Sequence, residues 1–137
     1  MPVKRVSPVD ARELIEKQGY VYVDVRSIPE FEAGHPEGAY NVPLAHLGPH
    51  GMIPNTEFLT VMQKQFPKDR KIVVGCKSGA RSLQAATILL ASGYSDVIDQ
   101  RAGFSGSTEP GWAQKGLPTA KDAPADHTFA GLGGKTK

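Results

Sequence analysis

The chain has 137 residues, of which 39% are hydrophobic and 22% are charged, and this size and composition fit one globular domain with a buried core. The net charge of +2, from 16 basic and 14 acidic side chains, is too small and too evenly spread for a nucleic-acid binder. A single cysteine excludes an internal disulfide and a cysteine-based zinc site.

The first residues contain no apolar segment that would serve as a signal peptide, and the sequence contains no apolar run of about 18 residues. We therefore expect a soluble protein with no membrane partner. A working thiol suits a reducing compartment. The expected location is the cytoplasm, or an organelle if a targeting segment has been removed.

A helix followed by a strand is predicted at the start of the chain. Ser7 is a suitable N-cap, Pro8 suits the first turn and Gly19 ends the helix. Residues 20–25 alternate apolar side chains as a strand does. Asp24 falls near the carboxyl end of this strand, the edge at which sites collect in parallel α/β sheets.

The charged residues that follow this strand are interpreted as supporting groups. Asp24 and Arg26 are expected to pair and brace neighbouring loops rather than to take part in catalysis. Ser27 and Glu30 form a capping box for a short helix, although the Glu30 carboxylate could instead face Arg81 or Arg26. Asp24, Arg26 and Glu30 are therefore placed beside the site and not in the reaction itself.

The middle of the chain continues the alternation of strands and helices. Residues 39–42 predict a short strand and residues 43–54 a segment rich in turns. Residues 56–66 carry an apolar stripe at helical spacing, which Pro67 ends. A last strand is predicted at residues 97–98.

The carboxyl-terminal part is predicted to hold a final helix and then a tail. The final helix carries Trp112. The domain is placed at residues 1–118, and residues 119–137 form a tail that is either flexible or docked, because this segment contains few core-forming side chains. Phe129 and Leu132 are the side chains that could dock on the domain.

A turn between a strand and a helix carries the only cysteine. Residues 72–74 form an apolar, β-branched strand, residues 82–91 have helical spacing, and Gly93 suits a left-handed cap. The loop between strand and helix holds Cys76, Lys77, Ser78, Gly79, Ala80 and Arg81. This arrangement aims backbone N–H groups and a helix N-terminus at the sulfur.

The sizes of these interactions predict a nucleophilic cysteine. A helix N-terminus contributes roughly 0.3–1 kcal/mol, whereas each hydrogen bond to a charged group contributes about 1.5–3 kcal/mol. Two or three loop amides converging on the sulfur would therefore outweigh the dipole. With Lys77 and Arg81 nearby, we expect Cys76 to be held as a thiolate, with Lys77, Ser78, Gly79, Ala80 and Arg81 as the substrate-binding residues.

The histidines show no pattern of a metal site or a catalytic pair. None of His35, His46, His50 and His127 lies in a metal-ligand spacing. A cysteine that is already a thiolate needs no base to attack. We therefore expect neither a metal nor a cofactor.

Taken together, these segments resemble the rhodanese-like sulfurtransferases. The loop at Cys76 resembles their active-site loop, and other stretches resemble the family's segments in the same order: 24–26, 30–31, 34–39, 41–43, 103–104, 112 and 116–118. The resemblance covers roughly residues 7–118. A short insertion at residues 105–111 departs from the family pattern, and it concerns the local path of the chain rather than the chemistry.

The resemblance implies a rhodanese-like three-layer α/β fold, with a small, mostly parallel central sheet and helices on both faces. It also implies a sulfurtransferase in which Cys76 carries sulfur as a persulfide. The partners would be a small anionic donor such as thiosulfate and an acceptor that is cyanide or a thiol, and a protein could also accept the sulfur. Lys77 and Arg81 would orient the anionic donor.

Two alternative functions remain open at this point. One is oxyanion chemistry by a phosphatase-like enzyme or an arsenate reductase; the loop between Cys76 and Arg81 has one residue fewer than that of the phosphatases that resemble rhodaneses, which favours a single sulfur atom over a phosphate. The other is a persulfide carrier that serves one protein partner.

Overall fold

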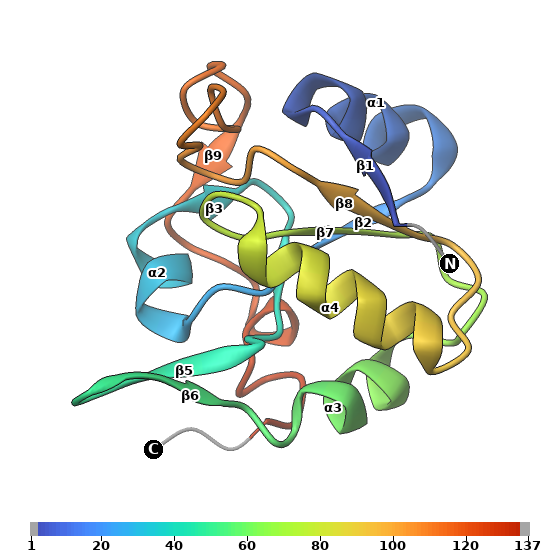
Figure 1. Ribbon diagram of the computed structural model, residues 1–137, viewed down its shortest axis with the longest axis vertical. Coiled ribbons are helices and arrows are strands. Elements are labelled where there is room, and N and C mark those ends of the chain that lie inside the picture. Colours follow the sequence, from blue (N-terminus) through green and yellow to red (C-terminus); the bar gives the residue numbers. More distant parts are fainter. Residues whose placement is uncertain (1–2, 135–137) are drawn as a thin grey trace.

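Parallel strands form the central sheet of the computed structural model, which describes residues 3–134 (Figure 1). The spatial order of the strands is β1-β8-β7-β2-β4, and every neighbouring pair runs parallel. The strands are β1 (Lys4–Val6), β2 (Val21–Asp24), β4 (Tyr40–Asn41), β7 (Ile72–Gly75) and β8 (Val97–Gln100). The central strand is β7, and the predicted α/β fold with a parallel sheet is confirmed.

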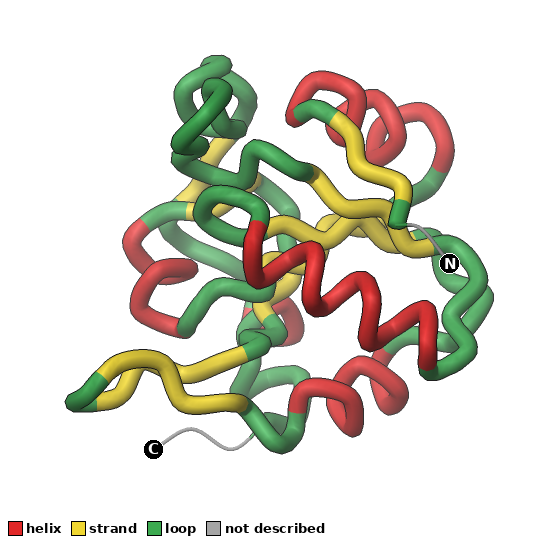
Figure 2. Tube along the Cα trace, in the orientation of Figure 1, coloured by secondary structure: helices red, strands yellow, loops and turns green. Residues whose placement is uncertain are grey.

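Side chains of the strands alternate between two apolar layers, as the period of two requires. On one face Val23, Ile72 and Val74 pack with residues of α3 (Phe58–Gln65) and α4 (Ala80–Ala91). On the other face Tyr22 and Val73 pack with α1 (Pro8–Gln18) and with Phe31 of α2 (Ile28–Ala33). Figure 2 shows the helices on both sides of the sheet. None of the helices within residues 3–134 is long and apolar enough to cross a membrane.

The predicted helix signals lie where the helices begin and end. The Ser7 hydroxyl accepts a hydrogen bond from the Asp10 amide (3.1 Å), and Gly19 ends α1 with a φ of 76°. The capping box of α2 is also present, because the Glu30 carboxylate accepts a hydrogen bond from the Ser27 amide. Gly93 follows α4 with a φ of 99°, a left-handed conformation that glycine adopts without strain.

A hairpin occupies most of the segment that was predicted to consist of turns, so this prediction was wrong for residues 45–54. Strands β5 (Ala45–Gly48) and β6 (Gly51–Pro54) pair antiparallel, with Gly48 opposite Gly51. Three apolar side chains of the hairpin are exposed: Leu47, Met52 and Ile53. The hairpin projects from the body of the molecule (Figure 1), and it therefore lacks the buried face that gives a strand its alternating pattern.

No helix forms around Trp112, contrary to the prediction. Residues 112–116 form a turn that closes at Gly116, where φ is 73°. The Trp112 indole donates a hydrogen bond to the Pro118 carbonyl (2.7 Å), which anchors the turn to β9 (Thr119–Ala120), and β9 pairs antiparallel with β3 (His35–Pro36). The segment is too short for a stable helix, because helix-breaking residues lie close together at Gly111, Gly116 and Pro118.

The described part of the predicted tail packs on the domain. After a 3₁₀ turn, η1 (Ala125–His127), Phe129 and Leu132 are 1% and 3% exposed and belong to the same core layer as α3 and α4. The Gln65 side chain donates a hydrogen bond to the Leu132 carbonyl (3.0 Å). Both side chains thus pack against the domain, while residues 1–2 of the predicted domain and 135–137 of the predicted tail lie outside the described range.

Candidate active site

Cys76 directly follows the central strand β7, so its loop opens at the carboxyl edge of the sheet, as predicted. Its side chain is 2% exposed. The preceding residue, Gly75, lies against the Tyr22 hydroxyl, which a side chain at this position would hit. The glycine therefore allows the strand end to pack closely beneath the cysteine.

The sulfur has fewer amide contacts than predicted. Among the described residues one backbone amide, that of Gly79, donates a hydrogen bond to the Cys76 Sγ (3.0 Å). The second polar neighbour is the Ser82 hydroxyl, 3.5 Å from Sγ. Ser82 takes this place because α4 begins at Ala80, two residues before the predicted start. Its side chain therefore belongs to the first turn of the helix and lies against the sulfur.

Ser82 is a site residue that the sequence analysis missed. Its side chain is fully buried; the hydroxyl oxygen accepts a hydrogen bond from the Cys76 thiol (3.5 Å), and the hydroxyl donates one to the Gly79 carbonyl (3.3 Å). The helical spacing of residues 82–91 did not indicate that the Ser82 side chain would contact the sulfur. A hydroxyl three residues after Gly79, at a helix N-terminus, was the available indication, since serine often hydrogen-bonds to the backbone at such a place.

The loop is fixed by the segment that follows β8. The Phe104 amide donates a hydrogen bond to the Cys76 carbonyl (2.8 Å), and the Ser105 amide donates one to the Lys77 carbonyl (3.0 Å). Gly103 lies so close to the carbonyls of Cys76 and Lys77 that no side chain would fit there. The chain leading into the predicted insertion thus holds the active-site loop from outside.

An ion pair between the exposed Arg5 and a buried aspartate clamps the same loop from the first strand. The Arg5 guanidinium donates hydrogen bonds to the Asp99 carboxylate (2.6 Å) and to the Gly79 carbonyl (3.2 Å). Asp99 is fully buried, and burial raises its pKa, although hydrogen bonds from Ser82 and Arg5 oppose this shift. Neither Arg5 nor Asp99 was expected at the site, because β1 was not predicted as a strand.

Glu30 faces Arg81, which was one of the partners considered for it. Arg81 donates two hydrogen bonds to the Glu30 carboxylate, of 2.7 and 3.0 Å, while the Ser27 hydroxyl and amide donate two more. Burial alone would raise the pKa of Glu30, but the bonds from Arg81 and Ser27 outweigh it and lower the pKa from 4.5 to about 2. The hydrogen bonds to Glu30 also raise the pKa of Arg81.

The low pKa of Glu30 predicts an acid-dependent loss of stability. Because Glu30 binds its proton at a higher pH in the unfolded chain, the pair stabilises the fold fully above pH 4.5 and is lost as the pH falls toward 2. Glu30→Gln should therefore lower the thermal midpoint at neutral pH, and the difference from the parent protein should vanish near pH 2. Circular dichroism melts across this range measure it.

The control for this titration is Glu37→Gln, which replaces an exposed glutamate and should leave the pH dependence of the thermal midpoint as it is. A Glu30→Gln difference that stays constant between pH 4.5 and 2 would contradict the assigned ion pair.

Asp24 and Arg26 form a buried pair that supports the loops around the site. Arg26 donates hydrogen bonds to both Asp24 carboxylate oxygens (2.8–3.0 Å) and to the Gly34 carbonyl (2.5 Å). The Asn41 side chain joins them by donating to the carbonyls of Asp24 and Arg26. Among the described residues no hydrogen bond joins either charged side chain to the Cys76 sulfur, and their supporting role stays a prediction.

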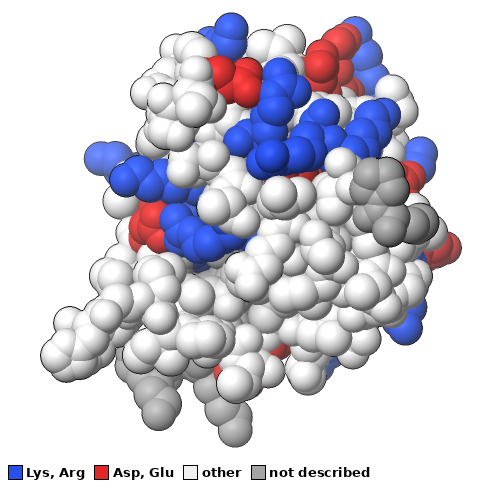
Figure 3. Space-filling model, in the orientation of Figure 1, with Lys and Arg blue, Asp and Glu red and all other residues white. Residues whose placement is uncertain are grey.

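The remaining loop residues form the outer surface of the site. Lys77, Ser78 and Ala80 are exposed, and the Lys77 ammonium makes no hydrogen bond or ion pair within residues 3–134. Figure 3 shows Lys and Arg side chains gathered over β1, β8 and the N-terminal end of α4. An anion approaching the Cys76 loop therefore meets a positive surface.

His35 lies away from any catalytic position. Its ring stacks on Phe31 with the centroids 3.8 Å apart, and its Nδ1 is 2.8 Å from the Phe31 carbonyl. This placement fits the structural role that the resemblance implied. Across residues 3–134 no group of three or more histidine, cysteine, aspartate or glutamate side chains is arranged to hold a metal ion.

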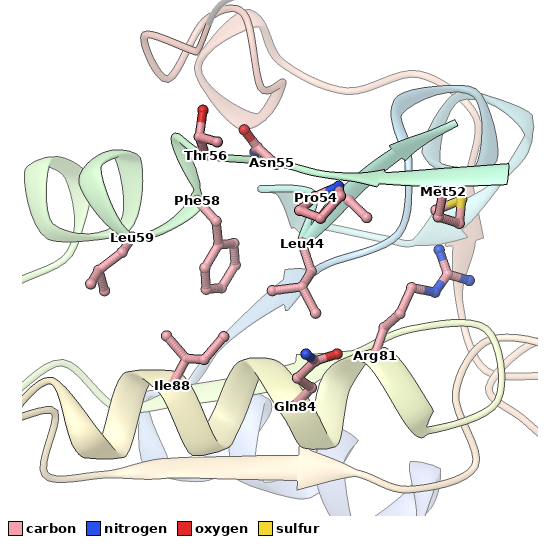
Figure 4. Close-up of a pocket in the computed structure, with 11 residues that line it drawn as sticks. Leu44, Met52, Pro54, Asn55, Thr56, Phe58, Leu59, Arg81, Gln84 and Ile88 are labelled. Carbon is pink, nitrogen blue, oxygen red and sulfur yellow. The ribbon is translucent and has the colours of Figure 1, made fainter. Parts of the chain in front are cut away.

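A hollow opens beside Arg81, between the hairpin β5–β6, the start of α3 and the outer face of α4 (Figure 4). Its volume is about 420 Å³. Arg81 lies at one end, near Met52, while Leu59 and Ile88 lie at the other. Most of the lining is apolar, and its main members are Leu44, Met52, Pro54, Phe58, Leu59 and Ile88.

Comparison with known proteins agrees with this geometry. Residues 7–109 match the family model of the rhodanese-like domain. The chain belongs to the rhodanese-like family. The chain is 44% identical over 101 residues to thiosulfate sulfurtransferase 16, chloroplastic, from Arabidopsis thaliana, a match that covers 74% of this chain and 80% of the relative. It is 31% identical over 118 residues to the thiosulfate sulfurtransferase GlpE of Haemophilus influenzae, covering 86% and 95% of the two chains.

A solved structure supports the fold as well. The crystal structure of Rv0390 from M. tuberculosis superposes with a TM-score of 0.77 at 26% identity, covering 89% of this chain and all of that chain. The matched rhodanese-like region includes the strand β7, the Cys76 loop and α4. The chain is thus a rhodanese-like domain protein related to thiosulfate sulfurtransferases.

Proposed function

We propose that the protein is a thiosulfate sulfurtransferase that carries sulfur as a persulfide on Cys76. The observation that carries this proposal is the position of the only cysteine, at the mouth of a strand-to-helix loop with the Gly79 amide 3.0 Å from its sulfur. Relatives named thiosulfate sulfurtransferase, at 44% and 31% identity, point to the same chemistry.

The reaction would be a double displacement. The Cys76 thiolate attacks the outer sulfur of thiosulfate, the sulfur–sulfur bond of the donor breaks, and sulfite leaves with the electron pair. An acceptor, cyanide or a thiolate, then attacks the outer sulfur of the persulfide, and the electron pair of the broken bond returns to Sγ. Neither step requires a general base once the cysteine is ionised.

The residues around the loop would stabilise the anionic sulfur. The Gly79 amide and the Ser82 hydroxyl lie at the inner sulfur, 3.0 and 3.5 Å from Sγ. The first amides of α4, which have no partner within the helix, are available to the outer sulfur of a persulfide. The loop would thus stabilise the anion before and after each transfer.

Lys77 is the residue that we expect to attract the donor. Arg81 is engaged by Glu30 in two hydrogen bonds, whereas the Lys77 ammonium is exposed and unpaired among the described residues. Lys77→Ala should raise the KM for thiosulfate about two- to fivefold, the range of an exposed charge interaction. Initial rates at several thiosulfate concentrations measure this, and the effect should shrink at high salt.

The matched control is Lys115→Ala, which removes another exposed ammonium, one that does not belong to the Cys76 loop. Its KM should equal that of the parent protein. Equal KM values for the Lys77 and Lys115 variants would show that Lys77 does not orient the donor.

Intact-protein mass spectrometry tests the proposed function directly. After incubation with thiosulfate, the protein should gain the mass of one sulfur atom, and a reductant should remove it. An unmodified protein whose thiol still reacts with an alkylating agent would reject thiosulfate as the donor. Parallel incubations with arsenate plus a small thiol, and with a phosphate ester, test the two oxyanion alternatives.

A further inference from the structure

We propose that the hollow between the hairpin β5–β6 and α4 binds the apolar body of a small organic thiol that accepts sulfur from Cys76. This inference rests on the proposed function and names the class of acceptor. The acceptor thiolate would attack the outer sulfur of the persulfide, its proton having gone to solvent. The bond between that sulfur and Sγ breaks, its electron pair returns to Sγ, and an organic persulfide leaves.

The size of the hollow is the first argument. Thiosulfate and cyanide contain only a handful of heavy atoms, and neither would fill a volume of about 420 Å³. Pockets that bind organic molecules measure roughly 300–1,000 Å³. The hollow is therefore larger than the small anions of the reaction need, and it matches an organic ligand.

The charge of the lining is the second argument. Among the lining residues Arg81 alone is ionised, and both of its terminal nitrogens already donate to Glu30. The Asn55 side chain is also satisfied, because it donates to the Pro43 carbonyl and accepts from the Glu57 amide. Figure 3 shows few charged side chains over α3, the hairpin and the part of α4 beyond its N-terminal end. The lining thus suits a neutral, apolar group.

The direction of the hollow is the third argument. Arg81, Gln84 and Ile88 follow one another along one face of α4 and line the hollow. Arg81 lies two residues after Gly79, the donor to the Cys76 sulfur, whereas Ile88 and Leu59 lie at the far end (Figure 4). A ligand with its thiol at the Arg81 end would therefore present sulfur toward the loop and bury its apolar body against Ile88.

The test uses protein loaded with persulfide and freed of thiosulfate. Benzyl mercaptan, with an apolar body, and 2-mercaptoethanol, with a small polar one, are added separately below saturation, and loss of the persulfide is followed by intact-protein mass spectrometry. We expect discharge by benzyl mercaptan to be at least about tenfold faster, the discrimination that a small apolar contact provides.

Two variants of α4 test whether the hollow causes the faster discharge by benzyl mercaptan. Ile88→Gln changes its lining and should bring the ratio of the two rates close to one. Leu90→Gln is the matched control, because Leu90 is also partly buried on α4 but does not line the hollow; this variant should keep the ratio of the parent protein. Equal rates for the two thiols in the parent protein, or equal ratios in the two variants, would overturn the proposal.

A binding measurement separates this inference from the proposed function. Cys76→Ser cannot exchange sulfur, and titration with benzyl mercaptan in calorimetry should give binding that Ile88→Gln weakens about tenfold or more. If the parent protein forms no persulfide, the proposed function fails, and this titration alone decides whether the hollow takes an apolar thiol. Absence of Ile88-dependent binding would overturn the inference. Contact with a protein partner would then be the alternative role of the exposed apolar side chains of the hairpin.

Discussion

Replacing Cys76 with serine should abolish the persulfide and lower sulfur transfer from thiosulfate to cyanide by about four orders of magnitude or more, as removal of a covalent nucleophile does. The chain has no other cysteine that could take its place. A serine hydroxyl is not ionised at neutral pH. Neither the new serine nor the neighbouring Ser82 can therefore replace the thiolate as the nucleophile. Initial rates of thiocyanate formation and intact-protein mass spectrometry measure the two effects.

Ser82→Ala provides the control for this experiment. It removes the hydroxyl that lies 3.5 Å from Sγ but keeps the thiol. The persulfide should still form, with a rate reduced by roughly tenfold: the Ser82 hydroxyl can rotate from the Gly79 carbonyl to donate to the ionised sulfur, and the variant loses this hydrogen bond to a charged group. A Cys76→Ser protein that retains the transfer rate of the parent would place the nucleophile elsewhere and reject the mechanism.

The largest effect on stability is expected from Asp24→Ala. Asp24 and Arg26 are 1% and 5% exposed and share three hydrogen bonds between their side chains. Removing the carboxylate leaves the Arg26 guanidinium buried without its counter-charge, which should lower the free energy of unfolding by about 3–5 kcal/mol. Equilibrium unfolding in urea, with Asp24→Asn as a milder second variant, gives this value.

An ion pair on the surface serves as the comparison. Glu16 accepts a hydrogen bond from Arg12 one turn away on α1, at 3.0 Å, and both side chains are at least one-third exposed. Glu16→Ala should cost about 0.5 kcal/mol or less. If Asp24→Ala cost no more than this, the buried pair would not brace the loops around the site.

The sequence predicted the elements whose pattern is local and strong. Residues 72–74 are β-branched and apolar because β7 is buried on both faces, and Ser7 and Gly19 mark the ends of α1 by their own backbone chemistry. Cys76 was found for the same reason, since a lone cysteine between a strand and a helix is a feature of neighbouring residues in the chain.

The features that the sequence did not predict depend on residues far apart in the chain. Arg5 and Asp99 are 94 positions apart and meet only because β1 pairs with β8. The position of Ser82 depended on the exact start of α4, and a shift of two residues changed which groups face the sulfur. Such boundaries are the least certain part of a prediction from sequence, because helix ends are decided by tertiary contacts.

The site therefore combines a nucleophile predicted locally with supporting groups brought in by the fold. The Phe104 amide, which donates to the Cys76 carbonyl, belongs to a segment in which no helix or strand was predicted. A hydrogen bond between backbone groups does not depend on the side chains, so the sequence of residue types does not reveal it. Only the assembled sheet brings the two segments together.

The burial of Phe129 and Leu132 has a consequence for how the protein is made. Both side chains fill the layer between the sheet and α3, yet they are synthesised after every strand of the central sheet. While a ribosome is still translating this part of the message, that layer lacks two of its apolar members and stays open to water. The final packing step must therefore wait until these residues leave the ribosome, so this layer of the core closes only near the end of synthesis.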